Sequence, residues 1–127
     1  MINKETLFYA IDNSGAGIVK VIASTKKAFK NIDIGDFVLV SVKRLRKKRR
    51  IFSKVKKGKI YIGLIAGLSK EKKKKVKHTF TRKDKNTIIL LSRNYKLMGN
   101  RIYKTLPIEL RRKPLIRSLS SVLSKLI

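Results

Sequence analysis

The sequence predicts a mainly β protein, a small five-stranded β-barrel that forms a single domain over residues 1–127. Short apolar runs, separated by glycine, Asn/Asp or basic clusters, fill about the first ninety residues without a long helical period, which is typical of short strands. The hydrophobic fraction of 43% supplies enough Ile, Val, Leu and Phe for one small core. Closing the strands into a barrel also removes exposed strand edges.

The strands follow one another along the chain. The first two flank a turn-rich segment, 12–17, and Gly35-Asp36 precedes the third. That third strand is apolar at nearly every position, so we expect it to be buried on both faces. The five expected strands are Thr6–Ile11, Ile18–Ala23, Phe37–Val42, Ile60–Ala66 and Thr87–Ser92.

Two basic segments interrupt the strands, 43–59 between the third and fourth and 70–85 between the fourth and fifth. Neither has the apolar content to fold in isolation, so we expect both to become ordered on phosphate. Ile51, Phe52 and Val55 give the first segment apolar anchors, and the flanking strands hold its ends together, so we expect it to extend as a β-ribbon. The candidate RNA-binding residues are Lys43, Arg44, Arg46, Lys47, Lys48, Arg49, Arg50, Lys54, Lys56, Lys57, Lys59, Lys72, Lys73, Lys74, Lys75, Lys77 and Arg82.

The C-terminal part, 105–127, has helical texture. Pro107 suits a first helical turn, and Pro114 ends that helix. A second short helix is expected to begin at Ser120 or Ser121 and to run to Ile127. We expect both short helices to pack on the barrel.

Charge dominates the composition. The 34 Lys and Arg residues against 7 Asp and Glu give a net charge of +27, which makes a nucleic acid the first partner to consider.

The absence of cysteine excludes disulfides, thiolate metal sites and a catalytic thiol, and His78 is the only histidine. The sequence contains no phosphate-binding loop or nucleophile elbow. Asp12, Asp33, Asp36 and Asp84 suit turns, so we expect no catalytic residue, cofactor or metal, and no enzyme.

Aromatic residues offer a second mode of RNA contact, because bases stack on their rings. Only Phe52 and Phe80 lie among lysines, and we expect stacking at these two. Tyr61, Tyr95 and Tyr103 are expected in the core, as is usual for aromatic residues in a sheet.

An ordered set of short motifs spans almost the whole chain and is similar to the pattern of the universal large-subunit ribosomal protein fourteen family. The motifs are Ile11-Asp12-Asn13-Ser14-Gly15-Ala16, Gly35-Asp36, Val55-Lys56-Lys57-Gly58, Asn86, Gly99-Asn100-Arg101-Ile102, Glu109-Leu110-Arg111 and Ser118-Leu119. The resemblance implies a five-stranded barrel with a projecting basic β-ribbon and short C-terminal helices. It makes segment 12–16 a structural turn.

The resemblance also implies partners. These are large-subunit rRNA at the subunit interface, small-subunit rRNA across it, and the neighbouring ribosomal proteins three and nineteen. Segment 99–102 is similar to the family surface that faces other subunits or a ribosome silencing factor, which makes Asn100 and Arg101 candidate contact residues. The chain departs from the family pattern at 82–85 and has Asn100 where Thr is common.

Localisation and rival functions follow from composition. The 24 Lys and 16 Ile against 5 Ala indicate A/T-rich codons. With a family match that starts at Met1, this favours a gene in a mitochondrial genome and a place in the mitochondrial ribosome, with a plastid or the bacterial cytoplasm as alternatives.

A DNA-compacting or single-stranded nucleic-acid-binding architectural protein is the alternative function. The lysine runs lack the apolar face of a membrane-surface helix, and Ile60–Ser69 is about half a membrane span.

Overall fold

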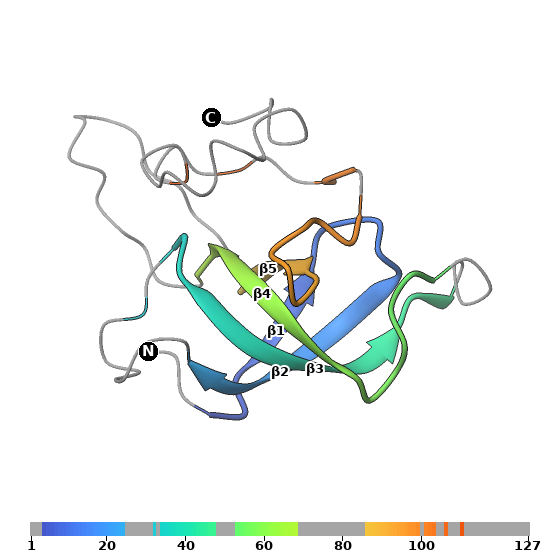
Figure 1. Cartoon of the computed structure of the whole chain (residues 1–127), viewed down its shortest axis with the longest axis horizontal. Coiled ribbons are helices and arrows are strands. Elements are labelled where there is room, and N and C mark those ends of the chain that lie inside the picture. The colour runs from blue at the N-terminus through green and yellow to red at the C-terminus, as the bar shows by residue number, and fades with distance from the viewer. Residues whose placement is uncertain are drawn as a thin grey trace.

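The computed structural model describes residues 4–24, 32, 34–47, 53–68, 86–99, 101–103, 106 and 110. Within these residues the strands form a closed barrel in the order β1-β2-β3-β4-β5, as Figure 1 shows. The strands are β1 (Leu7–Ala10), β2 (Ala16–Ser24), β3 (Phe37–Leu45), β4 (Ile60–Gly67) and β5 (Thr87–Leu91). The predicted five-stranded β-barrel is therefore confirmed.

The barrel closes between its first and last strands. Consecutive strands pair antiparallel, whereas β1 pairs parallel with β5. The amide of Tyr9 donates to the Asn86 carbonyl (2.9 Å), and the amide of Ile11 donates to the Ile88 carbonyl (3.1 Å). No edge is left between β1 and β5, so the sheet offers no template there for pairing with another chain.

Three strands are longer than the sequence predicted, β4 by the one residue Gly67. β2 already begins at Ala16, and β3 runs past Val42 to Leu45, which pairs with Ala16. Backbone pairing does not depend on side-chain charge, so Lys43 and Arg44 extend the strand while their side chains stay exposed. In the described residues of 43–59, only this extension is strand. The second half of the expected ribbon, 53–59, forms turns, because its amides bond to the barrel.

Three expected features lie outside the described residues wholly or in part. These are the middle of the basic ribbon (48–52), the basic loop 70–85, and the C-terminal helical part 105–127 apart from Leu106 and Leu110.

Alternating apolar side chains fill the barrel. Val38, Val40 and Val42 of β3 pack with Phe8 and Val19 in one buried cluster. This alternation is the period-two pattern of a strand with one face inward.

A second buried cluster covers the other face of β4 and β5. Leu64, Ile89 and Leu91 pack there with Leu106 and Leu110. All five residues of β5 are buried as a result, so this strand has no polar face. The expectation for β3 holds only in part, because Phe37 and Leu39 are half-buried against this cluster.

The turn between β1 and β2 is tied to β5 by a buried carboxylate. Asp12 accepts a hydrogen bond from the Ser14 hydroxyl (2.7 Å) and another from the backbone amide of Leu90 (3.2 Å). The predicted turn role of Asp12 is confirmed, and the bond to β5 is a long-range contact that the sequence did not indicate. Burial raises the pKa of the Asp12 carboxyl above its ordinary value of 3.8, and the hydrogen bonds from Ser14 and Leu90 oppose this shift.

The described part of the chain contains no helix with the length and hydropathy of a membrane span.

The raised pKa of Asp12 predicts a pH-dependent stability. The folded state holds the Asp12 proton more tightly than the unfolded chain does. The stabilisation that the protonated carboxyl gives the folded state is therefore fully present below pH 3.8 and is lost as the pH rises through the raised pKa. Asp12→Asn keeps the shape and removes the titration, since its amide can accept from Leu90 and donate to Ser14. The unfolding free energy of Asp12→Asn minus that of the wild type should therefore increase with pH.

Urea unfolding between about pH 3 and pH 8 measures this difference. Glu5→Gln, which removes an exposed carboxyl, is the control. A difference for Asp12→Asn that decreases with pH would show that the folded state favours the charged carboxylate.

Substitutions at Gly63 of β4 and Ile88 of β5 should be coupled in their effect on stability, because the two residues are in close contact in the core. A Cβ at Gly63 would lie against the Cδ1 atom of Ile88 and 2.9 Å from its Cγ1 atom. Because Ile88 is fully buried, Gly63→Ala should lower the unfolding free energy by about 1–3 kcal/mol. Removing the Cδ1 atom with Ile88→Val should restore part of that loss, although Ile88→Val alone costs about 1 kcal/mol.

A double-mutant cycle by urea unfolding measures the coupling between the two positions. Additive effects would mean that the core has room for the extra methyl group.

Candidate nucleic-acid interface

The two described parts of the basic segment 43–59, residues 43–47 and 53–59, are both bonded to the turn between β1 and β2. The amide of Arg46 donates to the carbonyl of Gly15 (2.8 Å), and the amide of Lys54 donates to the carbonyl of Ser14 (2.9 Å). Gly15 has a φ of 103°, and a Cβ there would lie 2.5 Å from the Ser53 hydroxyl oxygen. Only glycine allows both this backbone conformation and the close approach of residue 53.

The returning half of the segment is fastened at further points. Val55 is 1% exposed and belongs to the barrel core, as the sequence predicted for an apolar anchor. The Ser53 hydroxyl donates to the Val55 carbonyl (2.7 Å), and the Gly58 amide donates to the Val42 carbonyl (2.8 Å). We expected this segment to become ordered on RNA. In the described residues, 43–47 and 53–59 are hydrogen-bonded to the barrel, and ordering on RNA stays a prediction for the segment.

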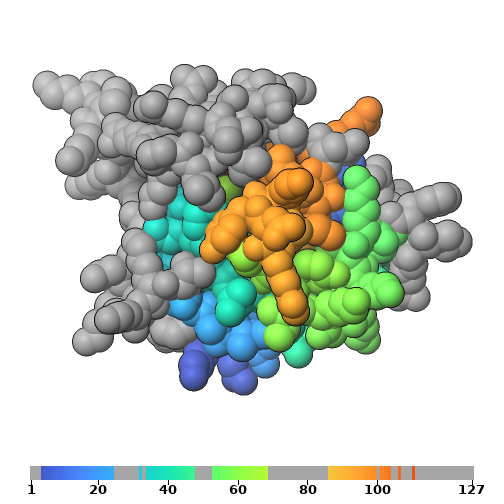
Figure 2. Space-filling view, viewed as in Figure 1, coloured from blue at the N-terminus to red at the C-terminus, as the bar shows by residue number. Residues whose placement is uncertain are grey.

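The attached ends carry a group of exposed basic side chains, which we call the basic face. Figure 2 shows residues 53–59 in green near the orange residues that follow β5, and backbone hydrogen bonds tie both segments to the β1–β2 turn. The basic face consists of the exposed residues Lys43, Arg44, Lys47, Lys54, Lys56, Lys57 and Lys59. Seven of the predicted RNA-binding residues are therefore exposed on the described parts of segment 43–59.

The remaining predicted residues divide into two groups. Arg46 is half-buried, and Arg101 is exposed on the segment after β5. The residues that lie outside the described part of the chain are Lys48, Arg49, Arg50, Lys72, Lys73, Lys74, Lys75, Lys77, Arg82 and Asn100.

Carboxylates are scarce around this face. Among the described residues, Asp12 and Asp36 are buried, and Glu5 is the exposed acid. Glu5 lies 3.6 Å from the ammonium of Lys20. Within the described part of the chain, therefore, no exposed carboxylate other than Glu5 competes with an external anion for the lysines.

The segment with Arg101 is fixed on the same turn. The Arg101 amide donates to the side-chain oxygen of Asn13 (3.0 Å), while the Asn13 amide donates to the Arg101 carbonyl (3.1 Å). Gly99 permits this approach, because a Cβ there would lie 2.5 Å from the Asn13 side-chain oxygen. The Arg101 side chain is thus presented from a rigid backbone.

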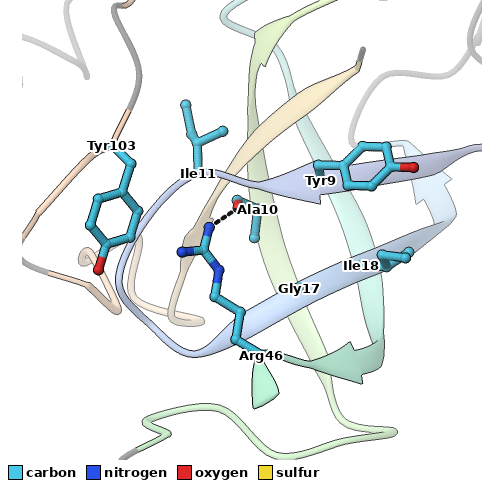
Figure 3. Close-up of a pocket in the computed structure, with 7 residues that line it drawn as sticks. All are labelled: Tyr9, Ala10, Ile11, Gly17, Ile18, Arg46 and Tyr103. Atoms are coloured by element: carbon cyan, nitrogen blue, oxygen red, sulfur yellow. Dashed lines mark hydrogen bonds between the residues drawn. The ribbon is translucent and has the colours of Figure 1, made fainter. Parts of the chain in front are cut away.

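Arg46 turns back onto the barrel. Its guanidinium donates to the carbonyl of Ala10 (2.9 Å) and lies 4.9 Å from the centre of the Tyr103 ring, as Figure 3 shows. A planar guanidinium stacks on an aromatic face and keeps hydrogen-bonding capacity at its edge. Arg46 therefore has a fixed orientation that the exposed lysines do not share.

The aromatic predictions are partly wrong. Tyr61 is half-buried against the core as expected, but Tyr95 and Tyr103 are 40% and 47% exposed. Phe52 and Phe80 lie outside the described residues. The sequence pattern failed for Tyr95 and Tyr103 because neither lies in a strand of the barrel.

Groups of three or more His, Cys, Asp or Glu side chains that would suit a metal ion are absent from the described residues. The arrangement is suited to binding a polyanion through many separate charges.

Comparison with known families gives a match over almost the whole chain. The family model described as Ribosomal protein L14p/L23e matches residues 1–124. The chain therefore belongs to the Ribosomal protein L14p/L23e family, as the motif order indicated, and has a structural role in the large ribosomal subunit.

Proposed function

We propose that this ribosomal protein binds large-subunit rRNA, mainly through phosphate contacts made by the basic face, and that it performs no catalysis. The observation that carries the proposal is the bonding of both described parts of segment 43–59 to one turn, with seven exposed Lys and Arg side chains. Phosphate contacts of this kind fix register and orientation without specifying sequence.

Counter-ion release supplies the free energy of binding. Each Lys or Arg that neutralises a phosphate releases condensed cations from the RNA, which is favourable at low salt. Hydrogen bonds from Arg46, Lys54 and Gly58 to the barrel order the backbone before RNA arrives. Less conformational entropy is then lost on binding, so more of the electrostatic gain appears as affinity.

The position at the subunit interface is also part of the proposal. Arg101 is exposed on a backbone that is bonded to Asn13, which suits a contact surface for a rigid partner. We assign to segment 99–102 the contacts with small-subunit rRNA, with ribosomal proteins three and nineteen, or with a ribosome silencing factor. The excess of Lys and Ile over Ala supports a place in the mitochondrial ribosome.

The proposal predicts a change in salt dependence on neutralising part of the basic face. In the variant Lys54→Gln, Lys56→Gln, Lys57→Gln, Lys59→Gln, the slope of log K against log salt for large-subunit rRNA should become shallower by about 3, since each phosphate contact contributes about 0.7–0.9. Filter binding of the rRNA over a series of salt concentrations gives the slope.

A matched control removes the same number of positive charges elsewhere. Lys4→Gln, Lys20→Gln, Arg93→Gln and Lys96→Gln lie outside the basic face, so together they should change the slope less. Equal slopes for the two variants would contradict a dedicated basic face. Sedimentation of tagged wild-type protein away from large subunits, with DNA and in a ribonuclease-resistant form, would favour the alternative DNA-compacting function.

A further inference from the structure

A shallow groove lies beside Arg46, where β1 and β2 separate. It has a volume of about 290 Å³ and is lined by Tyr9, Ala10, Ile11, Gly17, Ile18, Arg46 and Tyr103. In Figure 3 the rings of Tyr9 and Tyr103 lie on opposite sides of the Arg46 guanidinium, with the small residues between them. This volume is at the lower limit of ligand sites and suits one planar ring better than a larger molecule.

A β-bulge at Gly17 forms the floor of the groove. Ala16 pairs with Leu45 and Ile18 pairs with Arg44, so Gly17 is an extra residue in β2. A Cβ at Gly17 would lie 3.3 Å from the Arg44 carbonyl oxygen, so a side chain would crowd β3. The bulge bends the strand and increases its twist, which explains why β2 leaves β1 at this point.

Arg46 replaces the strand contact that the bulge removes. Tyr9 and Ile11 donate their amides toward β5, so Ala10 between them directs its carbonyl toward β2. Beyond Tyr9, whose partner is Ile18, β2 supplies no further pair to β1, and the guanidinium of Arg46 donates to the Ala10 carbonyl instead. The contact with the Tyr103 ring then fixes the plane of the guanidinium.

We infer that this groove binds one unpaired nucleobase of rRNA, an inference that rests on the proposed function. Tyr9 and Tyr103 are 41% and 47% exposed, and exposed rings stack on bases of any sequence. Ile18 is half-buried and offers apolar surface, whereas Ala10 and Ile11 are buried and only close the groove from below. Arg46 adds a stacking plane and hydrogen-bond donors. Lys43 and Arg44 at the end of β3, and Lys47 two residues after it, are exposed and can neutralise the flanking phosphates.

The charge of this region favours a nucleotide over a protein side chain. The groove adjoins the basic face, and within the described residues its lining includes Arg46 but no carboxylate. A protein partner that placed an apolar side chain here would have to bring its own acids to compensate the lysines. An RNA strand supplies a planar apolar group and the compensating charge together.

The test separates stacking from phosphate binding. The probe is a short abasic RNA strand that carries a single 2-aminopurine as its one base, compared with the same strand made fully abasic. The wild type should quench the 2-aminopurine fluorescence and bind the abasic strand about 5- to 150-fold more weakly, as for one stacked base. Tyr103→Leu and Tyr9→Leu should lose the quenching and the preference for the base, with an unchanged salt slope because no charge is removed.

Two further variants test whether the effects are specific to the groove. Tyr95→Leu removes an exposed tyrosine that packs edge-to-face on Phe37, away from the groove lining, and it should retain the quenching. Arg46→Lys keeps the charge but loses the planar stack, so it should reduce the preference for the base without changing the salt slope. Thermal unfolding confirms that each variant is folded.

The groove proposal fails if Tyr9→Leu and Tyr103→Leu quench and discriminate as the wild type does. If these variants bind both strands normally but enter large subunits poorly, a neighbouring protein occupies the groove and the nucleobase is excluded. In both cases the salt-dependent binding of wild-type protein to rRNA would be intact. Its absence would instead overturn the proposed function itself.

Discussion

The turn between β1 and β2, residues 12–15, holds the rest of the structure in place. Asp12 binds the Leu90 amide in β5, and Asn13 exchanges two hydrogen bonds with the Arg101 backbone. Ser14 and Gly15 accept the amides of Lys54 and Arg46. Moving this turn would leave backbone groups without partners in a largely buried region, a loss of about 1–3 kcal/mol for each. One short turn thereby fixes the barrel end and both candidate binding segments.

This constraint links the fold to binding. A strongly basic segment resists compaction because its charges repel one another. Attaching its two ends at one turn shortens the chain that RNA has to order and sets the positions of the lysines next to it. The same attachment places Arg46 so that its guanidinium bonds to Ala10 of β1. The basic face and the groove between Tyr9 and Tyr103 therefore both depend on the bonds to this turn.

Local patterns in the sequence were sufficient for the barrel, because the short apolar runs of the five strands are properties of neighbouring residues. They did not predict that β3 continues through Lys43 and Arg44, since backbone pairing with β2 is independent of those side chains. The bonds from Asp12 to Leu90 and from Arg46 to Ala10 join residues 78 and 36 positions apart, and such contacts have no local signal. For the same reason Arg46 was grouped with the phosphate-binding lysines, although its guanidinium is fixed on the barrel.

The central claim is that the basic segment is attached to the barrel before RNA binds. Native-state amide exchange on RNA-free protein tests it most directly at Arg46, Lys54 and Gly58, whose amides donate to Gly15, Ser14 and Val42. We predict that these three amides exchange much more slowly than in an unstructured chain, together with the amides of β2 and β3. Exchange at the unstructured rate, while Leu90 stays protected, would show that only the barrel is ordered and that RNA has to order the whole segment.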